Sequence, residues 1–194
     1  MLFRSLEQTL AHSWAIFVHG KILTRLAATS LKLEQAKSRG DLVGFNDALD
    51  SLEITLQNPE LEFDQSQHSL KVELESRLVP WEGLVDIKVI IPEKTLEVTG
   101  PRIADVGEVI EEVISNSVRH GKSAHLSVTI NLVDGKDINL TVEDDSNIDI
   151  PEYQIRYGLG TKLFNLATDG RWDLRHTPRG SIFEATISLT DGKF

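Results

Sequence analysis

The stretch Glu108-Val-Ile-Glu-Glu-Val-Ile-Ser-Asn-Ser-Val-Arg-His-Gly121 is the most informative part of this chain for its fold. Its apolar residues recur at steps of three and four, which predicts a helix with one side facing a core. Glu112, Asn116 and His120 are spaced four apart on a second face, and Arg119 lies beside them. Such a polar set is costly on a half-buried helix unless something binds there. The alternative is an ordinary amphipathic helix whose polar face is solvated. In either case Gly121 is a common residue at the end of a helix.

The composition limits the class of protein. The 194 residues allow one ordinary domain or two small ones. Hydrophobic residues make up 40% and charged residues 26%, as in soluble globular proteins, and no apolar run reaches the ~18 residues of a membrane span. The absence of cysteine excludes disulfides and thiolate metal sites, and the six histidines lack the spacing of a zinc site.

The charge is unevenly distributed. The formal net charge of −10 argues against nucleic acid as a general partner. Residues 1–40 contain six Lys or Arg against two Glu, a balance of +4, so residues 41–194 carry −14. This asymmetry suggests two segments with different partners.

Periodicity predicts a helical hairpin in the first part of the chain. Residues 2–38 are typical of one long helix and residues 41–57 of a second, with a Gly-Asp pair as the stop and the next N-cap. Two helices alone cannot bury both apolar stripes, so pairing of two chains into a four-helix bundle is the simplest completion. Asn58-Pro59 breaks the pattern, and the polar residues 60–67 mark the boundary.

The rest of the chain predicts an α+β fold with helices on one face of a mixed sheet. Asp134-Gly135 between two alternating runs is a strong hairpin signal. The predicted elements are helices over 68–79, 102–120 and 159–168, strands over 85–91, 124–132, 137–143, 172–176 and 181–189, and a short strand near 96–98.

Three further motifs follow the opening helix. Glu143-Asp144-Asp145-Ser146 ends a buried strand, where a carboxylate can accept a hydrogen bond from a buried amine, although a plain strand-to-loop turn has the same pattern. Gly158-Leu159-Gly160 opens a helix, where the backbone can approach a phosphate. Gly180-Ser181 leads into the last strand. Each motif is a weak signal by itself.

Taken in order, these motifs resemble the GHKL (Bergerat) ATP-binding domain shared by gyrase-type ATPases, Hsp90 and sensor histidine kinases. The Asn box of that family reads Glu-x-x-x-Asn-x-x-(Lys/Arg)-His. The four matching residues are Glu112, Asn116, Arg119 and His120. The match spans about residues 68–190, and it implies an α/β sandwich with a mixed sheet in an ATP-binding domain over residues 63–194.

The predicted hairpin resembles the dimerisation and histidine-phosphotransfer domain of sensor histidine kinases, which would occupy residues 1–62. The segment around His19 is similar to the phosphoacceptor box of the subfamily with a short ATP lid, and residues 146–157 would form that short lid. The resemblance implies that His19 is phosphorylated. The alternatives are that His19 is a bundle histidine without this role, or that His12 or His68 is the acceptor.

The resemblance also implies roles at the phosphate end of an ATP site. Asn116 would hold the Mg²⁺ that bridges the phosphates, and Glu112 would polarise a water or the metal shell. Arg119 and His120 would lie near the phosphates. The reaction needs positioning and charge neutralisation, and the neutral imidazole of His19 would attack the γ-phosphoryl group.

At the base end, the resemblance implies that Asp144 accepts the adenine amine. Gly158 and Gly160 would flank the lid and the phosphates. Ser181 or Thr186 would line the adenine pocket.

The expected protein is therefore a cytoplasmic sensor histidine kinase core, a homodimer that passes a phosphoryl group to an Asp of a response regulator. Its connection to a membrane would run only through a sensor region outside this chain. The positive first segment would attract the acidic pocket of the regulator.

Two departures from the family favour a second hypothesis. Gly20 follows His19 where many members have a carboxylate, and Ser146 and Ile148 replace both glycines of the acidic box, Asp-x-Gly-x-Gly. The second hypothesis is a degenerate, non-catalytic dimer that acts as a phosphotransfer or regulator-docking scaffold. A serine kinase of the anti-sigma type shares the ATP-binding domain but has no helical hairpin.

Overall fold

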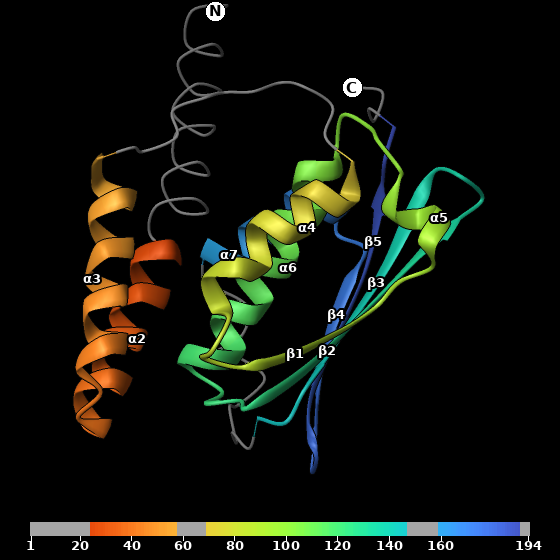
Figure 1. Ribbon diagram of the computed structural model, residues 1–194. Coiled ribbons are helices and arrows are strands. Elements are labelled where there is room, and N and C mark those ends of the chain that lie inside the picture. The colour runs from red at the N-terminus through yellow and green to blue at the C-terminus, as the bar shows by residue number, and fades with distance from the viewer. Residues whose placement is uncertain (1–23, 58–68, 147–158, 191–194) are drawn as a thin grey trace, which may run out of the picture. The chain divides into compact units, whose positions relative to one another are not determined.

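The computed structural model describes residues 24–57, 69–146 and 159–190, and the chain divides into two compact units, residues 1–63 and 64–194. In the first unit, α2 (Thr24–Arg39) and α3 (Leu42–Gln57) pack as a helical hairpin (Figure 1). Gly40 between them has a φ of +66°, and Asp41 caps α3 by accepting a 3.0 Å hydrogen bond from the N–H of Gly44. The part of the expected first helix before Thr24 lies outside the described residues.

The second unit is built on a five-stranded mixed sheet, which confirms the predicted α+β class. β1 and β2 are parallel, and every other neighbouring pair is antiparallel. Across the sheet the strands are β1 (Asp86–Ile90), β2 (His125–Val133), β3 (Asp137–Asp144), β5 (Gly180–Ser188) and β4 (Trp172–Thr177). Asp134 and Gly135 both have positive φ, as the predicted β2–β3 hairpin requires.

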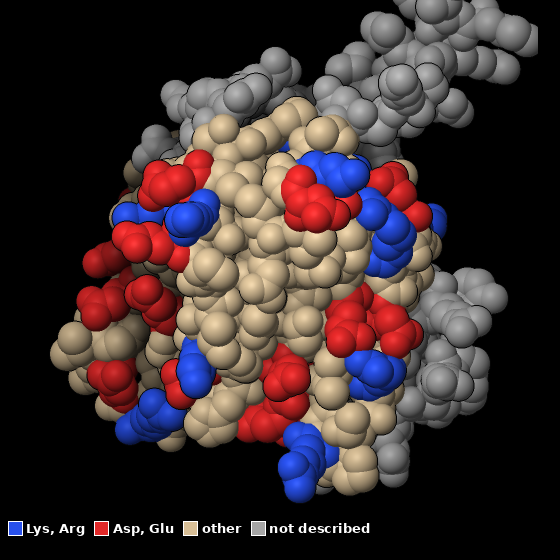
Figure 2. Space-filling model, turned by 90° about the vertical axis from the view of Figure 1, so that its right-hand side faces the viewer, with Lys and Arg blue, Asp and Glu red and all other residues tan. Residues whose placement is uncertain are grey.

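Helices cover one face of this sheet (Figure 1). α6 (Ile103–Arg119) and α7 (Leu159–Thr168) lie against the central strands, and α4 (Leu70–Leu78) packs on α6. Alternate strand residues such as Val128, Leu140 and Ile187 are fully buried beneath the helices. Figure 2 shows the opposite face, where charged side chains lie mainly around an uncharged central area.

The strand predicted near residues 96–98 is wrong. After Pro92 the chain forms the short helix α5 (Glu93–Leu96), because the N–H of Thr95 turns back to the carbonyl of Pro92 at 2.8 Å. Only Thr99 makes a bridge, to Ser69. Pro92 fixes its own φ and favours this local turn over a paired strand.

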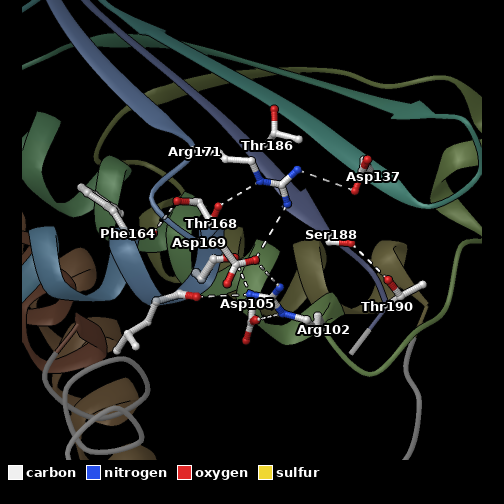
Figure 3. A network of polar contacts seen from close by, with 12 residues as sticks. Arg102, Asp105, Asp137, Phe164, Thr168, Asp169, Arg171, Thr186, Ser188 and Thr190 are labelled. Carbon is white, nitrogen blue, oxygen red and sulfur yellow. Dashed lines mark hydrogen bonds and ion pairs between the residues drawn. The ribbon is translucent and has the colours of Figure 1, made fainter. Parts of the chain in front are cut away.

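Arg102 ties the start of α6 to the end of α7 (Figure 3). Its guanidinium donates to the carboxylates of Asp105 at 2.7 Å and Asp169 at 3.1 Å, and to the carbonyl of Ala167 at 2.6 Å. The last carbonyls of α7 have no partner within the helix, so a cation placed there stabilises the helix end. This contact holds the C-terminal end of α7 to the N-terminal end of α6.

A buried ionic cluster joins α4 to α6. Arg77 of α4 bonds Glu73 at 2.8 Å and Glu111 at 2.5 Å, and Glu108 lies 3.9 Å away. Gly107 makes room for this cluster, because a Cβ at that position would overlap the carboxylate of Glu73. Within the described ranges, no helix combines the length and apolar character needed to cross a membrane.

Candidate functional site

Glu112 and Asn116 lie one turn apart on the C-terminal half of α6, and both are half-buried. The amide nitrogen of Asn116 donates a 3.1 Å hydrogen bond to the carboxylate of Glu112. With its nitrogen directed to Glu112, the atom of Asn116 suited to a cation is its amide oxygen. The spacing of four residues places the two side chains on one face of the helix, as the sequence predicts.

Gly160, in the first turn of α7, lies directly against Glu112. A Cβ at this position would overlap a carboxylate oxygen of Glu112, so a larger residue here would push the Glu112 side chain aside. Gly160 of the Gly-Leu-Gly motif is thereby brought to the Asn box, although it lies 48 positions after Glu112 in the sequence. The first N–H groups of α7 have no partner within the helix and favour an anion.

Asp144, the last residue of β3, is held by four hydrogen bonds from three serines. Ser117 donates its hydroxyl to Oδ2 at 2.5 Å. Oδ1 accepts the N–H of Ser146 at 3.0 Å, the hydroxyl of Ser146 at 2.5 Å and the N–H of Ser181 at 2.8 Å. Burial alone would raise the pKa of Asp144, but these hydrogen bonds outweigh it and the pKa is lowered, so the group is a carboxylate.

Two glycines allow the backbone to pass close to this carboxylate. A Cβ on Gly180, whose φ is +139°, would overlap the main chain of Asp144. A Cβ on Gly121 would lie 2.8 Å from the Cβ of Ser146 and 2.5 Å from the carbonyl oxygen of Ser117. The helix ends near Gly121 as expected, but this glycine serves the close approach to Ser146 and has no left-handed backbone.

The structure therefore gathers most of the expected site residues. Arg119 and His120 are exposed at the end of α6, and the N–H of His120 donates to the carbonyl of Asn116 at 2.9 Å. Of the two residues expected to line the base pocket, Ser181 contacts Asp144. Thr186 does not, because strand side chains alternate between faces.

Thr186 instead bonds the exposed Asn139 at 3.0 Å, on the face of the sheet away from the helices. It lies five residues, or about 16 Å, further along β5 than Ser181. The structure thus separates Thr186 from the candidate site. Gly158 and His19 lie outside the described residues.

Sequence reasoning missed two residues of the site and misjudged a third. Ser117 carried a signal, since it directly follows Asn116 in a helix already assigned to the site. Nothing in the sequence pattern marked His176 of β4, whose Nδ1 lies 2.9 Å from the hydroxyl of Ser181. The sequence comparison treats Ser146 as a departure from a family glycine, whereas in the structure its hydroxyl donates to Asp144.

The residues present fit ATP and Mg²⁺. The Glu112 carboxylate and the Asn116 amide oxygen are hard oxygen ligands of the kind that Mg²⁺ prefers. No group of three or more His, Asp or Glu in the described ranges could hold a metal by itself, so the remaining ligands would be phosphate oxygens and water. At the base end, Oδ2 of Asp144 accepts one hydrogen bond from the described part of the chain, that of Ser117, and has a second lone pair for an amine.

Comparison with known proteins shows similarity of fold. No protein-family model and no curated protein sequence matches the chain. The histidine kinase domain of the Erythrobacter litoralis EL346 blue-light activated histidine kinase has a TM-score of 0.51 at 14% identity, covering 96% of this chain and 93% of that domain. The histidine kinase domain of the E. coli osmosensor EnvZ has a TM-score of 0.50 at 16% identity, covering 70% of this chain and 95% of that domain.

A longer structure of the blue-light activated histidine kinase matches with a TM-score of 0.51 at 18% identity over 77% of this chain, and the match spans about half of it (51%). The fold of this chain is therefore that of histidine kinase domains, which confirms the resemblance predicted from the motifs.

Proposed function

We propose that this chain is the core of a two-component sensor histidine kinase. It binds Mg·ATP in residues 63–194, phosphorylates His19 within a homodimer and passes the phosphoryl group to an Asp of a response regulator in the cytoplasm. One observation carries the proposal. Four motifs far apart in sequence meet at the C-terminal half of α6, with Glu112 against Gly160 and Ser117 bonded to Asp144.

At the phosphate end, bound Mg²⁺ would neutralise charge on the β- and γ-phosphates. Asn116 would hold the ion through its amide oxygen, and Glu112, which accepts the amide N–H of Asn116, would polarise a water or the metal shell. Arg119 and His120, exposed one turn further along, would face the phosphates from the end of the same helix. Gly160 would let the start of α7 approach the phosphate groups.

At the base end, Asp144 would accept the exocyclic amine of adenine. Its lowered pKa keeps it ionised, so it can only accept hydrogen bonds. Because the serines hold both carboxylate oxygens, the acceptor is positioned before the base arrives, which reduces the entropy lost on binding.

In the reaction, a ring nitrogen of neutral His19 forms a bond to the γ-phosphorus while the bond to the bridging oxygen of ADP breaks. The proton of the other ring nitrogen then passes to solvent water, because Gly20 has no side chain that could accept it. Pairing of two chains is supported by α3, where Leu42, Leu49 and Leu56 recur every seven residues and are 78%, 42% and 60% exposed. Such a stripe is suited to helix–helix contact in a four-helix bundle.

The proposal is tested with γ-labelled Mg·ATP on the full chain. We expect acid-labile label that is lost in His19→Gln and in Asn116→Ala, and retained in His125→Gln, which alters an exposed histidine outside the site. Acid-stable label would indicate a serine kinase. Neither label nor nucleotide binding would indicate the non-catalytic scaffold.

A further inference from the structure

An unbroken chain of hydrogen bonds runs from an exposed histidine to Asp144. In the antiparallel register, His176 of β4 lies opposite Ser181 of β5, with 2.9 Å between Nδ1 and the hydroxyl. The hydroxyl of Ser181 lies 2.7 Å from that of Ser146, which lies 2.5 Å from Oδ1 of Asp144. Ser146 and Ser181 are buried, with 7% and 9% of their surface exposed.

Counting hydroxyl protons determines the direction of this chain. Asp144 is ionised and can only accept, so the single hydroxyl proton of Ser146 must point to Oδ1. The contact between Ser146 and Ser181 then needs the proton of Ser181, since otherwise two lone pairs would face each other at 2.7 Å. With its own proton directed to Ser146, Ser181 can only accept from His176. Nδ1 of His176 must therefore carry a proton.

A second consequence concerns what the site can recognise. The hydroxyl protons of Ser117, Ser146 and Ser181 are all directed to partners within the chain of contacts. The serines around Asp144 therefore offer acceptors to a base and no hydroxyl donor. At position 6 of the ring, a 6-amino purine supplies the donor that such a site needs, whereas a 6-oxo purine presents an acceptor there.

We propose that His176 is a positioning residue of the base site, which directs the proton of Ser181 inward and so sets the preference of Asp144 for a 6-amino purine. This role rests on the proposed nucleotide site. If the group at position 176 accepts instead of donating, the hydroxyl of Ser181 turns outward and Ser146 loses its incoming proton. The N–H of Ser181 still donates to Oδ1 of Asp144, but its hydroxyl no longer supports the carboxylate through Ser146.

The preference for ATP over GTP tests this role in the full chain, because both nucleotides carry the same triphosphate and added charge affects them alike. Binding of fluorescent ATP and GTP analogues is measured for the wild type, His176→Asp, which can only accept, and His176→Asn, whose amide still donates. We expect His176→Asp to lower the ratio of ATP affinity to GTP affinity roughly three- to tenfold. The same ratio in His176→Asn should stay within about twofold of the wild-type ratio. His125→Asp is the matched control on an exposed histidine of β2, and its ratio should not change.

An unchanged ratio in His176→Asp, with ATP still bound by the wild type, would overturn the role of His176 and leave the proposed function standing. Wild-type protein that binds neither nucleotide would overturn both. The protonation of His176 is measured separately by ¹⁵N NMR of the imidazole rings, assigned by the loss of one signal in His176→Asn. We expect a proton on Nδ1, and a bare Nδ1 would refute the direction of the chain.

Discussion

Replacing Glu108 by Gln should stabilise the protein at pH 8. Glu108 belongs to a cluster in which one guanidinium, that of Arg77, faces three carboxylates between α4 and α6. Glu73 and Glu111 take the short contacts, and Glu108 is left at 3.9 Å. A carboxylate in this position is removed from water with only a long contact to a cation, so its charge is costly.

The magnitude follows from the pKa of Glu108. Burial outweighs the attraction of Arg77 and, together with the neighbouring carboxylates, raises this pKa from 4.5 to about 7. The folded state therefore binds the proton more tightly than the unfolded chain. Its contribution to stability is complete below pH 4.5 and is lost as the pH rises through 7. The difference between the two pKa values corresponds to roughly 3 kcal/mol in the free energy of unfolding. Because 20% of the side chain is exposed, water relieves part of the cost, and we expect about 2 kcal/mol.

Urea unfolding at pH 5 and pH 8 measures this effect. On going from pH 5 to pH 8, the free energy of unfolding should fall more for the wild type than for Glu108→Gln. At pH 8 the variant should therefore be more stable than the wild type by about 2 kcal/mol. Glu75→Gln, on the exposed side of α4, is the matched control and should follow the wild type. If Glu108→Gln is less stable than the wild type at pH 8, the attraction to Arg77 dominates and the reasoning is refuted.

Two further substitutions test how the site is held. Gly121→Ala places a Cβ against Ser146 and the carbonyl of Ser117. We expect the free energy of unfolding measured in urea to fall by about 1–3 kcal/mol, and nucleotide binding to weaken. Unchanged stability would show that the close approach is not needed. Arg102→Gln removes the guanidinium that caps α7 at the carbonyl of Ala167. It should lower the free energy of unfolding by about 1–2 kcal/mol, which would be seen as a lower melting temperature. A melting temperature equal to that of the wild type would contradict the capping role.

Much of the fold could be predicted because its signals are local. A period of 3.6 residues identified α3 and α6, and alternation around Asp134-Gly135 identified the β2–β3 hairpin. On α6 the same period translates directly into a shared face, which is why the pairing of Glu112 with Asn116 could be predicted from their spacing alone. The strand expected near residues 96–98 failed because three residues carry too weak a pattern to outweigh a turn after Pro92.

Local patterns were sufficient for the helical hairpin, the helix that carries Glu112 and Asn116, and the order of the motifs, because each depends on residues within one or two turns of one another. Which motif residues meet was settled only by tertiary packing. Strand register places Ser181 beside Asp144, sends Thr186 to the other face and brings His176 into the chain of hydrogen bonds. Packing of α4 on α6 likewise created the cluster around Arg77. These contacts join residues far apart in sequence, and their free energy depends on burial and geometry that no local pattern contains.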